Sequence, residues 1–242
     1  MTTSLLPSPG MLQQLNGRFV YLLPAEEADR EVLRPLARDG RIWEFTKTLM
    51  INDTYDEQWD AYFNEALGLG MTGTGQAFVI REKREWGGAH EVSLGEDLRD
   101  GSRESGGKGQ AGSSGNGQVT GDRIIGMTRM FAIDWSARRL EIGHTWYLPE
   151  VWGKVYNKEC KLLLLQYLFE RLHFNRVEFR VAHQNVRSQR AVQKIGGEWE
   201  GVLRKFVKRN DGTWRNTVIF SIIDDEWPVK KKALQEMVGI HA

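Results

Sequence analysis

Two stretches decide the fold: residues 140–206, LEIGHTWYLPEVWGKVYNKECKLLLLQYLFERLHFNRVEFRVAHQNVRSQRAVQKIGGEWEGVLRKF, and residues 211–227, DGTWRNTVIFSIIDDEW. Residues 140–148 are rich in aromatic and β-branched side chains, which predicts a strand. Residues 154–173 carry leucines at helical spacing, which predicts a long helix with one buried stripe. The order strand, turn, long helix is the start of a layered α/β unit.

The rest of the first stretch continues this pattern. Residues 176–182 alternate between polar and apolar side chains, which predicts a strand. Residues 186–195 form a short amphipathic segment that stops at two glycines, a common end signal for a helix. The sequence Asn210-Asp211-Gly212 lies between two β-rich runs, 200–208 and 213–223, and therefore predicts a hairpin.

Working outward toward the N-terminus, the sequence predicts further strands and helices. We expect strands at 19–23, 76–81 and 123–133, a helix that begins near residues 24–26, and helical segments at 41–48 and 57–67. Antiparallel strands followed by a β-helix-β unit imply an α/β (α+β) domain: a mixed, mostly antiparallel twisted sheet with helices on both faces.

Glycine is unevenly distributed along the chain. Of 26 glycines, 11 fall within residues 87–121, a Ser/Gly-rich and charged segment between two predicted strands. Such a segment lacks the apolar surface that would offset its ordering entropy. We therefore expect one domain spanning residues 1–242, with a flexible insertion at 84–121 that expands a hairpin loop; a functional lid is the alternative.

Composition narrows the function classes. The 242 residues carry 33 Lys and Arg against 32 Asp and Glu, a net charge of +1, which disfavours a nucleic-acid partner bound through a basic face. The single cysteine, Cys160, excludes an internal disulfide framework. No stretch has the length of a membrane span and the N-terminus lacks a signal-peptide pattern, so a cytoplasmic location without membrane association is the expectation. The lysines at 230–232 are read as the solvated face of a terminal helix.

Two positions in the first stretch are suited to binding an anionic cofactor. A helix N-terminus presents unpaired N–H groups and a partial positive charge, and Gly153 lies just before the predicted long helix. Asn185 and Ser188 follow a strand and open a short helix. Helix capping explains Asn and Ser there equally well, and one glycine at a strand–helix turn is common, so each signal alone is weak.

Taken together, the motifs resemble the GNAT superfamily of acetyl-CoA-dependent N-acetyltransferases, and within it the ribosomal-protein alanine acetyltransferases (the Rim group). The resemblance rests on the EIG strand, the WGK turn, the N-x-x-S pair, the K-x-G turn, EGVLR, DG-x-W and the closing E-W, which occur here in the family's order. It covers about 90 residues. It implies a GNAT fold in which the strand at 140–148 bulges and splays away from the next strand, with acetyl-CoA lying in the gap.

The resemblance also implies roles for individual residues. Backbone groups near Tyr147 and Leu148 would hold the thioester and pantetheine, and Asn185 would fix the pantetheine arm or the neighbouring loop. Ser188 occupies the position of a hydroxyl near the departing thiolate. The pyrophosphate would lie on the turn formed by Trp152, Gly153, Lys154, Val155, Tyr156 and Asn157.

Three positions depart from the family pattern. The phosphate turn of the superfamily reads Arg/Gln-x-x-Gly-x-Gly/Ala, and Val155 and Asn157 replace its two later small residues. Lys154 and Asn157 offer a charge and a donor in partial compensation. Many members carry a tyrosine acid where this chain has Val192, so a hydroxyl donor would be Ser188 or Tyr156.

Acetyl transfer needs a neutral amine, so a base must remove a proton directly or through water. Glu141 and His144 are the candidates, and strict alternation places them on opposite faces unless a bulge intervenes. We favour Glu141; a cross-strand ion pair with an arginine is the alternative for it, and a packed or solvent-facing ring is the alternative for His144. Backbone N–H groups of the splayed strand would polarise the thioester carbonyl. Cys160 lies among leucines and is expected in the core rather than as a nucleophile.

Other activities fit the sequence less well. No Gly-x-Gly-x-x-Gly motif follows a strand, and the five histidines lack ligand spacing, which disfavours hydride transfer and metal hydrolysis. We expect acetyl-CoA as co-substrate, no metal, and a primary amine acceptor, either a protein N-terminus or a small molecule. The rival is a GNAT-fold CoA-binding or protein-interaction module with weakened catalysis. The chain would be a monomer or homodimer. The acceptor side is expected to include Trp43, Phe45, Trp59 and Trp214, although tryptophans are as readily core residues.

Overall fold

The computed structural model describes residues 14–47, 53–83 and 122–240. Their centre is one eight-stranded sheet with the order β1-β2-β3-β4-β5-β6-β8-β7. Within it only β5 and β6 pair in parallel, so the predicted mixed and mostly antiparallel sheet is confirmed. The strands are β1 (Leu15–Asn16), β2 (Val20–Pro24), β3 (Gln76–Glu82), β4 (Arg123–Asp134), β5 (Arg139–Tyr147), β6 (Arg176–Ala182), β7 (Glu198–Lys208) and β8 (Trp214–Ile223).

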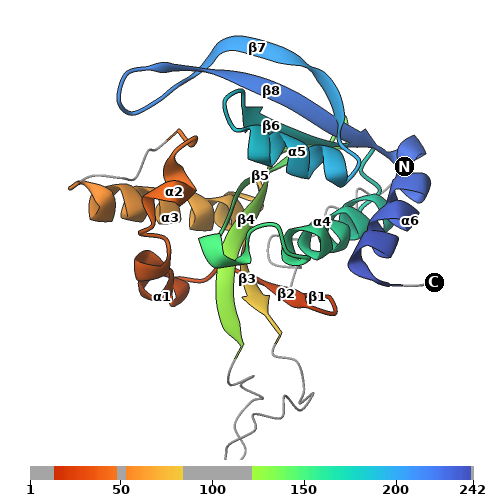
Figure 1. Ribbon diagram of the computed structural model, residues 1–242, viewed down its shortest axis with the longest axis horizontal. Coiled ribbons are helices and arrows are strands. Elements are labelled where there is room, and N and C mark those ends of the chain that lie inside the picture. The colour runs from red at the N-terminus through yellow and green to blue at the C-terminus, as the bar shows by residue number, and fades with distance from the viewer. Residues whose placement is uncertain (1–13, 48–52, 84–121, 241–242) are drawn as a thin grey trace, which may run out of the picture.

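Helices lie on both sides of this sheet, as the alternation of elements predicts. Figure 1 shows α1, α2 and α3 on one side, with α4 and α6 on the other. The helices are α1 (Asp29–Leu36), α2 (Gly40–Trp43), α3 (Tyr55–Thr72), α4 (Tyr156–Gln166), α5 (Val186–Lys194) and α6 (Trp227–Val238). The α5 segment, the β7–β8 hairpin with Gly212 at φ +84°, and a terminal helix all agree with the predictions. Of the three lysines on that helix only Lys232 is exposed; the Lys230 side chain is 14% exposed and forms ion pairs with Glu198 and Glu226.

Several helix boundaries differ from the predictions. The segment expected at 41–48 is an α-helix over Gly40–Trp43 only, and the segment expected at 57–67 extends over Tyr55–Thr72. The first helix begins at Asp29 rather than near Pro24, because Pro24 is still paired with Phe78 in the sheet and the Ala25 N–H donates to the Ala77 carbonyl at 2.9 Å. The long helix begins at Tyr156, and its last turn is a π-helix, Tyr167–Arg171. Leu168 and Phe169 in that π turn are buried, so the apolar stripe continues although the helical hydrogen-bond pattern changes.

The strands that flank the glycine-rich segment are antiparallel neighbours. Glu82 at the end of β3 lies opposite Arg123 at the start of β4, which is the arrangement expected for the two arms of a hairpin. The predicted insertion at 84–121 lies outside the described residues.

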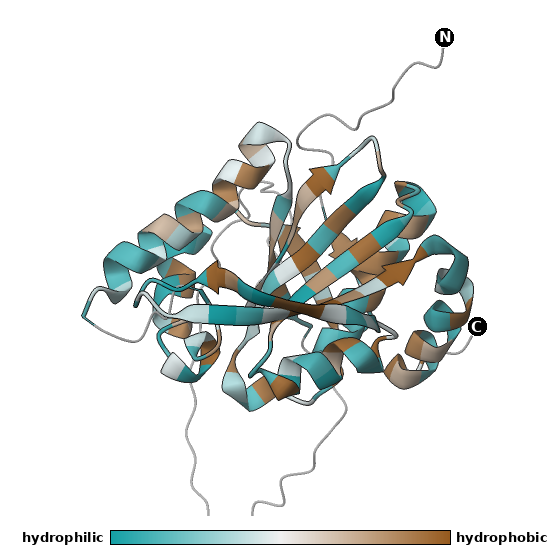
Figure 2. Cartoon of the chain, turned by 90° about the horizontal axis from the view of Figure 1, so that it is seen from above, coloured by the Kyte–Doolittle hydropathy of each residue, from teal (hydrophilic) through white to brown (hydrophobic). Residues whose placement is uncertain are grey.

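A continuous hydrophobic core fills both sides of the sheet. Apolar residues gather along the strands, while long stretches of the helices are hydrophilic (Figure 2). Cys160 is fully buried, as expected of a core residue. Trp43 and Trp59 are also core residues, 2% and 0% exposed, so the expectation that they line an acceptor cleft is wrong. No helix among the described residues has both the length and the apolar character that crossing a membrane requires.

Candidate active site

The parallel strands β5 and β6 separate soon after they meet. Their pairing covers Arg139–Arg176, Leu140–Val177 and Glu141–Glu178, and stops there. β5 continues to Tyr147 and β6 to Ala182 without further pairing between them. The splayed pair implied by the family resemblance is therefore present, and Glu141 lies at the last paired position before the gap opens.

A β-bulge interrupts β5 just beyond Glu141. Gly143 lies opposite Arg129 and Trp146 opposite Met127, so His144 and Thr145 together face one residue of β4. His144 takes a positive φ of 47° in this bulge.

The bulge changes which face of the sheet His144 occupies. Its ring lies 5.1 Å from that of Phe131, the residue directly opposite Glu141 on β4. Glu141 and His144 therefore share one face of the sheet, the outcome that strict alternation would have forbidden. His144 also lies 6.0 Å from the Tyr62 ring of α3. Desolvation, together with the nearby cations of Arg129, Lys47 and Arg215, lowers the pKa of the imidazole, so His144 is neutral at pH 7.

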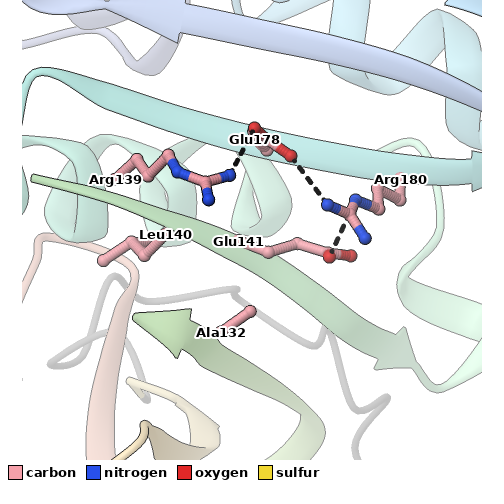
Figure 3. A pocket seen from close by; sticks show the side chains of 6 residues that line it. All are labelled: Ala132, Arg139, Leu140, Glu141, Glu178 and Arg180. Atoms are coloured by element: carbon pink, nitrogen blue, oxygen red, sulfur yellow. Dashed lines mark hydrogen bonds and ion pairs between the residues drawn. The ribbon is translucent and has the colours of Figure 1, made fainter. Parts of the chain in front are cut away.

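Glu141 is a buried carboxylate with a raised pKa. The residue is 7% exposed, and its Oε2 lies 3.3 Å from Nε of Arg180. Burial raises the pKa to about 7, an effect that Arg180 opposes and Glu178 reinforces. A cavity of about 160 Å³ adjoins this carboxylate (Figure 3). The arginine pair considered as an alternative for Glu141 is thus present together with the properties of a general base.

The neighbouring carboxylate, Glu178 on β6, differs in its surroundings. It accepts a hydrogen bond from Arg176 at 3.0 Å. It also accepts one from Arg180 at 3.1 Å and lies 3.8 Å from Arg139, as Figure 3 shows. Burial alone would raise its pKa, but the two arginine hydrogen bonds outweigh burial and lower it. Of the two acids that line the cavity, Glu141 is therefore the one whose pKa suits proton transfer near neutral pH.

The turn between β5 and α4 has the features of a phosphate site. No side chain caps the N-terminus of α4, so its first N–H groups point outward without a partner from the helix. Gly153 has φ +79°, and open space surrounds the position of a Cβ there. Lys154 is exposed, and Asn157 lies in the first turn of the helix. These groups fit a pyrophosphate.

Three residues of this turn contact the rest of the protein. The Val155 side chain packs against the hydrophobic core, and the Tyr156 hydroxyl hydrogen-bonds to Glu82 on β3. The indole of Trp152 donates to the Tyr147 carbonyl at 2.9 Å, and its ring lies 3.5 Å from the guanidinium of Arg187. Because the Tyr156 hydroxyl is already hydrogen-bonded to Glu82 on β3, we take Ser188 as the candidate hydroxyl donor to the departing thiolate.

The end of β5 has one backbone face toward the gap. The Leu148 N–H donates to the Ile125 carbonyl of β4 at 2.9 Å. Since backbone groups of successive strand residues point in opposite directions, the Tyr147 N–H points toward the gap. Of the two predicted backbone sites, Tyr147 is thus the one with a donor facing away from β4.

The N-x-x-S pair opens α5 on the β6 side. Asn185 is the N-cap, and its side chain accepts a hydrogen bond from the Ser188 N–H at 3.0 Å, so the capping interpretation is confirmed for Asn185. The Ser188 hydroxyl is partly exposed and has no protein partner among the described residues. Val192 is buried.

Sequence reasoning missed a polar cluster behind the bulge. The Lys161 ammonium, 4% exposed, donates to Thr145 at 2.8 Å and to Thr128 at 3.2 Å, and the two hydroxyls lie 2.7 Å apart. The sequence signal for this cluster is Lys161, a charged residue within the otherwise apolar stretch 160–165. Across the described ranges, no three His, Cys, Asp or Glu side chains gather in a way that could hold a metal ion.

Known proteins resemble this chain in sequence and in fold. Two relatives from Bacillus subtilis are "Probable N-acetyltransferase YjcK", 35% identical over 43% of this chain and 59% of its own length, and "Putative ribosomal N-acetyltransferase YdaF", 32% identical over 45% and 58%. The chain thus spans less than two thirds of the length of the curated relatives it matches. The crystal structure of a putative acetyltransferase from T. thermophilus has a TM-score of 0.69 and 27% identity, and covers 93% of this chain and 96% of that one. RimJ of Mycobacterium smegmatis in complex with CoA-disulfide has a TM-score of 0.67 at 16% identity over 95% and 96%, which shows a shared fold.

A mixed sheet whose one parallel pair splays beside an uncapped helix N-terminus agrees with the fold that the family resemblance implies. The model of the acetyltransferase (GNAT) domain family matches residues 20–198, about three quarters of the chain. The protein belongs to the GNAT acetyltransferase family.

Proposed function

We propose that this protein transfers the acetyl group of acetyl-CoA to a primary amine, a protein N-terminus or a small molecule, by direct attack in a ternary complex. The observation that carries the proposal is Glu141, which is 7% exposed, has its pKa raised to about 7, and lies where β5 and β6 separate. A base with this pKa is largely ionised at physiological pH and still accepts a proton readily.

Acetyl-CoA would lie in the gap between β5 and β6. The pyrophosphate would take the N–H groups at the start of α4, with Lys154 and Asn157 nearby and Gly153 leaving space for a close approach. The pantetheine would hydrogen-bond to backbone groups at Tyr147. Asn185 would contribute by holding the first turn of α5 in place beside the gap.

The chemical step exchanges a C–S bond for a C–N bond. Glu141 takes a proton from the acceptor ammonium, directly or through one water, and the neutral nitrogen attacks the thioester carbonyl carbon. Backbone N–H groups of the splayed strand stabilise the negative charge that develops on the carbonyl oxygen. The C–S bond then breaks with its electron pair on sulfur, the nitrogen loses its second proton to that thiolate, and the Ser188 hydroxyl would donate a hydrogen bond to the departing sulfur. His144, neutral and on the same face, is the second candidate base.

A GNAT-fold binding module with weakened turnover is the second candidate. Val192 replaces a tyrosine acid, and the hydroxyl of Tyr156 is bound to Glu82. Calorimetric titration with acetyl-CoA, combined with thiol release across a panel of amines and N-terminal peptides, separates the two. Binding with turnover on at least one acceptor supports the transferase; binding without turnover on any supports the module; absence of binding contradicts both.

For the chain as a whole we propose one acetyltransferase domain, with residues 84–121 inserted between β3 and β4. The support is that every described strand joins one sheet and that the flanking residues Glu82 and Arg123 are already paired.

A further inference from the structure

The face of the sheet that carries Glu141 has a guanidinium without a carboxylate partner. Arg215 of β8 donates to the Phe45 carbonyl at 3.2 Å and to the Thr217 hydroxyl at 3.3 Å, and its buried Nε has no hydrogen-bond partner. No described carboxylate forms an ion pair with it. These two contacts fix the side chain between β8 and the segment after α2.

Two further cations border the same region. The Asn210 N–H at the tip of the β7–β8 hairpin donates to the Lys47 carbonyl at 3.3 Å, which brings the hairpin against the segment after α2. The Lys47 ammonium is exposed and forms no ion pair with a described residue. Arg209 beside the hairpin turn bonds through its guanidinium to the Gln184 side-chain oxygen at 2.9 Å. It forms no ion pair with a described carboxylate, although the nearby Asp211 interacts with its charge.

The acids on this face do not neutralise these cations. Glu178 is held by Arg176 and Arg180, and Arg180 is also the ion-pair partner of Glu141. The charge of Arg215, Arg209 and Lys47 is therefore in excess over the acids of the cleft.

This excess positive charge lowers the pKa of neighbouring groups. Lys47 and Arg215 both contribute to the lowered pKa of His144, after desolvation and Arg129. Desolvation and, next, Arg209 lower the pKa of Arg215 itself, and the opposing attraction of Glu141 does not cancel them. A bound anion would raise the pKa of both His144 and Arg215, because it would add negative charge close to them.

We propose that the acceptor is an anionic amine, with a carboxylate or phosphate group close to its amino group. The anion would lie between Arg215 and Lys47, and the amine would face Glu141. This inference rests on the proposed acetyl transfer and names the substrate class for it. Arg and Lys are the side chains that bind carboxylate and phosphate, and Arg does so with a directed pair of donors.

Positive potential at this place also suits the reaction. Burial, and after it the charges of Arg129, Lys47 and Arg215, lower the pKa of His144. The same positive charges disfavour an ammonium beside it, and so shift the acceptor toward its free-amine form. A polyamine carries no anion and would meet only repulsion from these cations. Substrate charge therefore becomes the discriminating property.

The test compares acceptors that differ only in the anion, at saturating acetyl-CoA and low salt. Suitable pairs are amino acids and their amides, tripeptides with Glu or Gln after the N-terminal residue, and phosphoethanolamine and ethanolamine, with spermidine as the cationic extreme. We expect at least a tenfold higher kcat/KM for the anionic member of one or more pairs. The peptide pairs separate a protein N-terminus from a small molecule as the source of the anion.

Variants connect this preference to the side chains. Arg215→Gln and Lys47→Gln should raise the KM for the anionic acceptor about tenfold and leave that for its neutral partner unchanged, while Arg215→Lys retains part of the preference. Lys232→Gln, an exposed lysine of α6, is the matched control for loss of one charge, and unchanged acetyl-CoA affinity shows that each variant is folded. Turnover with equal or better kcat/KM for the neutral or cationic members would overturn the inference alone. Absence of thiol release with every acceptor would overturn the acetyl transfer and the inference with it.

Discussion

Replacing Glu141 by glutamine removes the proposed base with almost no change in shape. A carboxyl group with a pKa of about 7 is roughly one-tenth ionised at pH 6 and nine-tenths ionised at pH 8, so kcat/KM of the unmodified protein should rise about tenfold over that range. An acceptor amine with a pKa of about 10 stays an ammonium throughout this range, so the rise reports the ionisation of Glu141 alone. In Glu141→Gln the rate should fall by about 100-fold or more at pH 8, and the step near pH 7 should disappear.

The same substitution should also raise the free energy of unfolding at neutral and alkaline pH. The pKa of Glu141 is about 7 in the folded protein and 4.5 in the unfolded chain. Between pH 4.5 and 7 the folded state therefore holds a proton that the unfolded chain has lost. The free energy of unfolding therefore falls as pH rises from 4.5 to 7, by about 3 kcal/mol, and levels off above 7. Glu141→Gln lacks this fall and should be the more stable protein at pH 8 in urea titrations. The variant's inactivity would then not be attributable to unfolding.

Glu178→Gln is the matched control, since it makes the same charge change one strand away on a carboxyl whose pKa is lowered. It should retain a pH step that belongs to Glu141, moved to lower pH because Glu178 no longer raises the pKa of Glu141. A Glu141→Gln protein that keeps both its rate and this step would refute the assignment and move the base to His144 or to solvent.

Three further predictions concern the scaffold. Glu159 is fully buried in α4 and accepts hydrogen bonds from the backbone N–H groups of Arg18, Phe19 and Val20 at 2.5–2.7 Å. Glu159→Gln should therefore lower the free energy of unfolding by about 3 kcal/mol. A loss under about 1 kcal/mol in urea titrations would contradict this. Burial lowers the pKa of Lys161 below its ordinary 10.5, so the unfolded chain binds a proton that the folded protein has lost. The free energy of unfolding should therefore rise as the pH approaches 10.5, and Lys161→Met should flatten that rise. An identical pH profile of stability in the variant would contradict the lowered pKa of Lys161. Deleting residues 88–119 should leave acetyl-CoA affinity within about twofold in calorimetry, because β3 and β4 are already in hairpin register; lost binding would show that the segment contributes to the site.

The sequence predicted most of the sheet because its strands alternate or end at strong turn residues. Residues 176–182 and the turn at Gly212 are examples, since period-two patterning and a glycine with positive φ are local properties. The first helix was placed too early because Pro24 is a common helix starter, whereas its pairing with Phe78 is a long-range contact that local pattern does not contain.

The site was predicted less completely than the fold. Family motifs located Glu141 and the turn at Gly153, but the common face of Glu141 and His144 depends on a bulge set by the pairing of β5 with β4. Arg215 belongs to no motif. Its relevance arises from a contact with Phe45, 170 positions away in the chain.

The central claim is acetyl transfer from acetyl-CoA to an amine within the β5–β6 gap. The most direct test is mass spectrometry of the acceptor panel after incubation with acetyl-CoA and the full-length protein, with released thiol measured in the same samples. We expect an acceptor heavier by one acetyl group, formed in equal amount to free CoA thiol and abolished by Glu141→Gln. Thiol release without an acetylated acceptor, or neither product with any amine although acetyl-CoA binds, would contradict it.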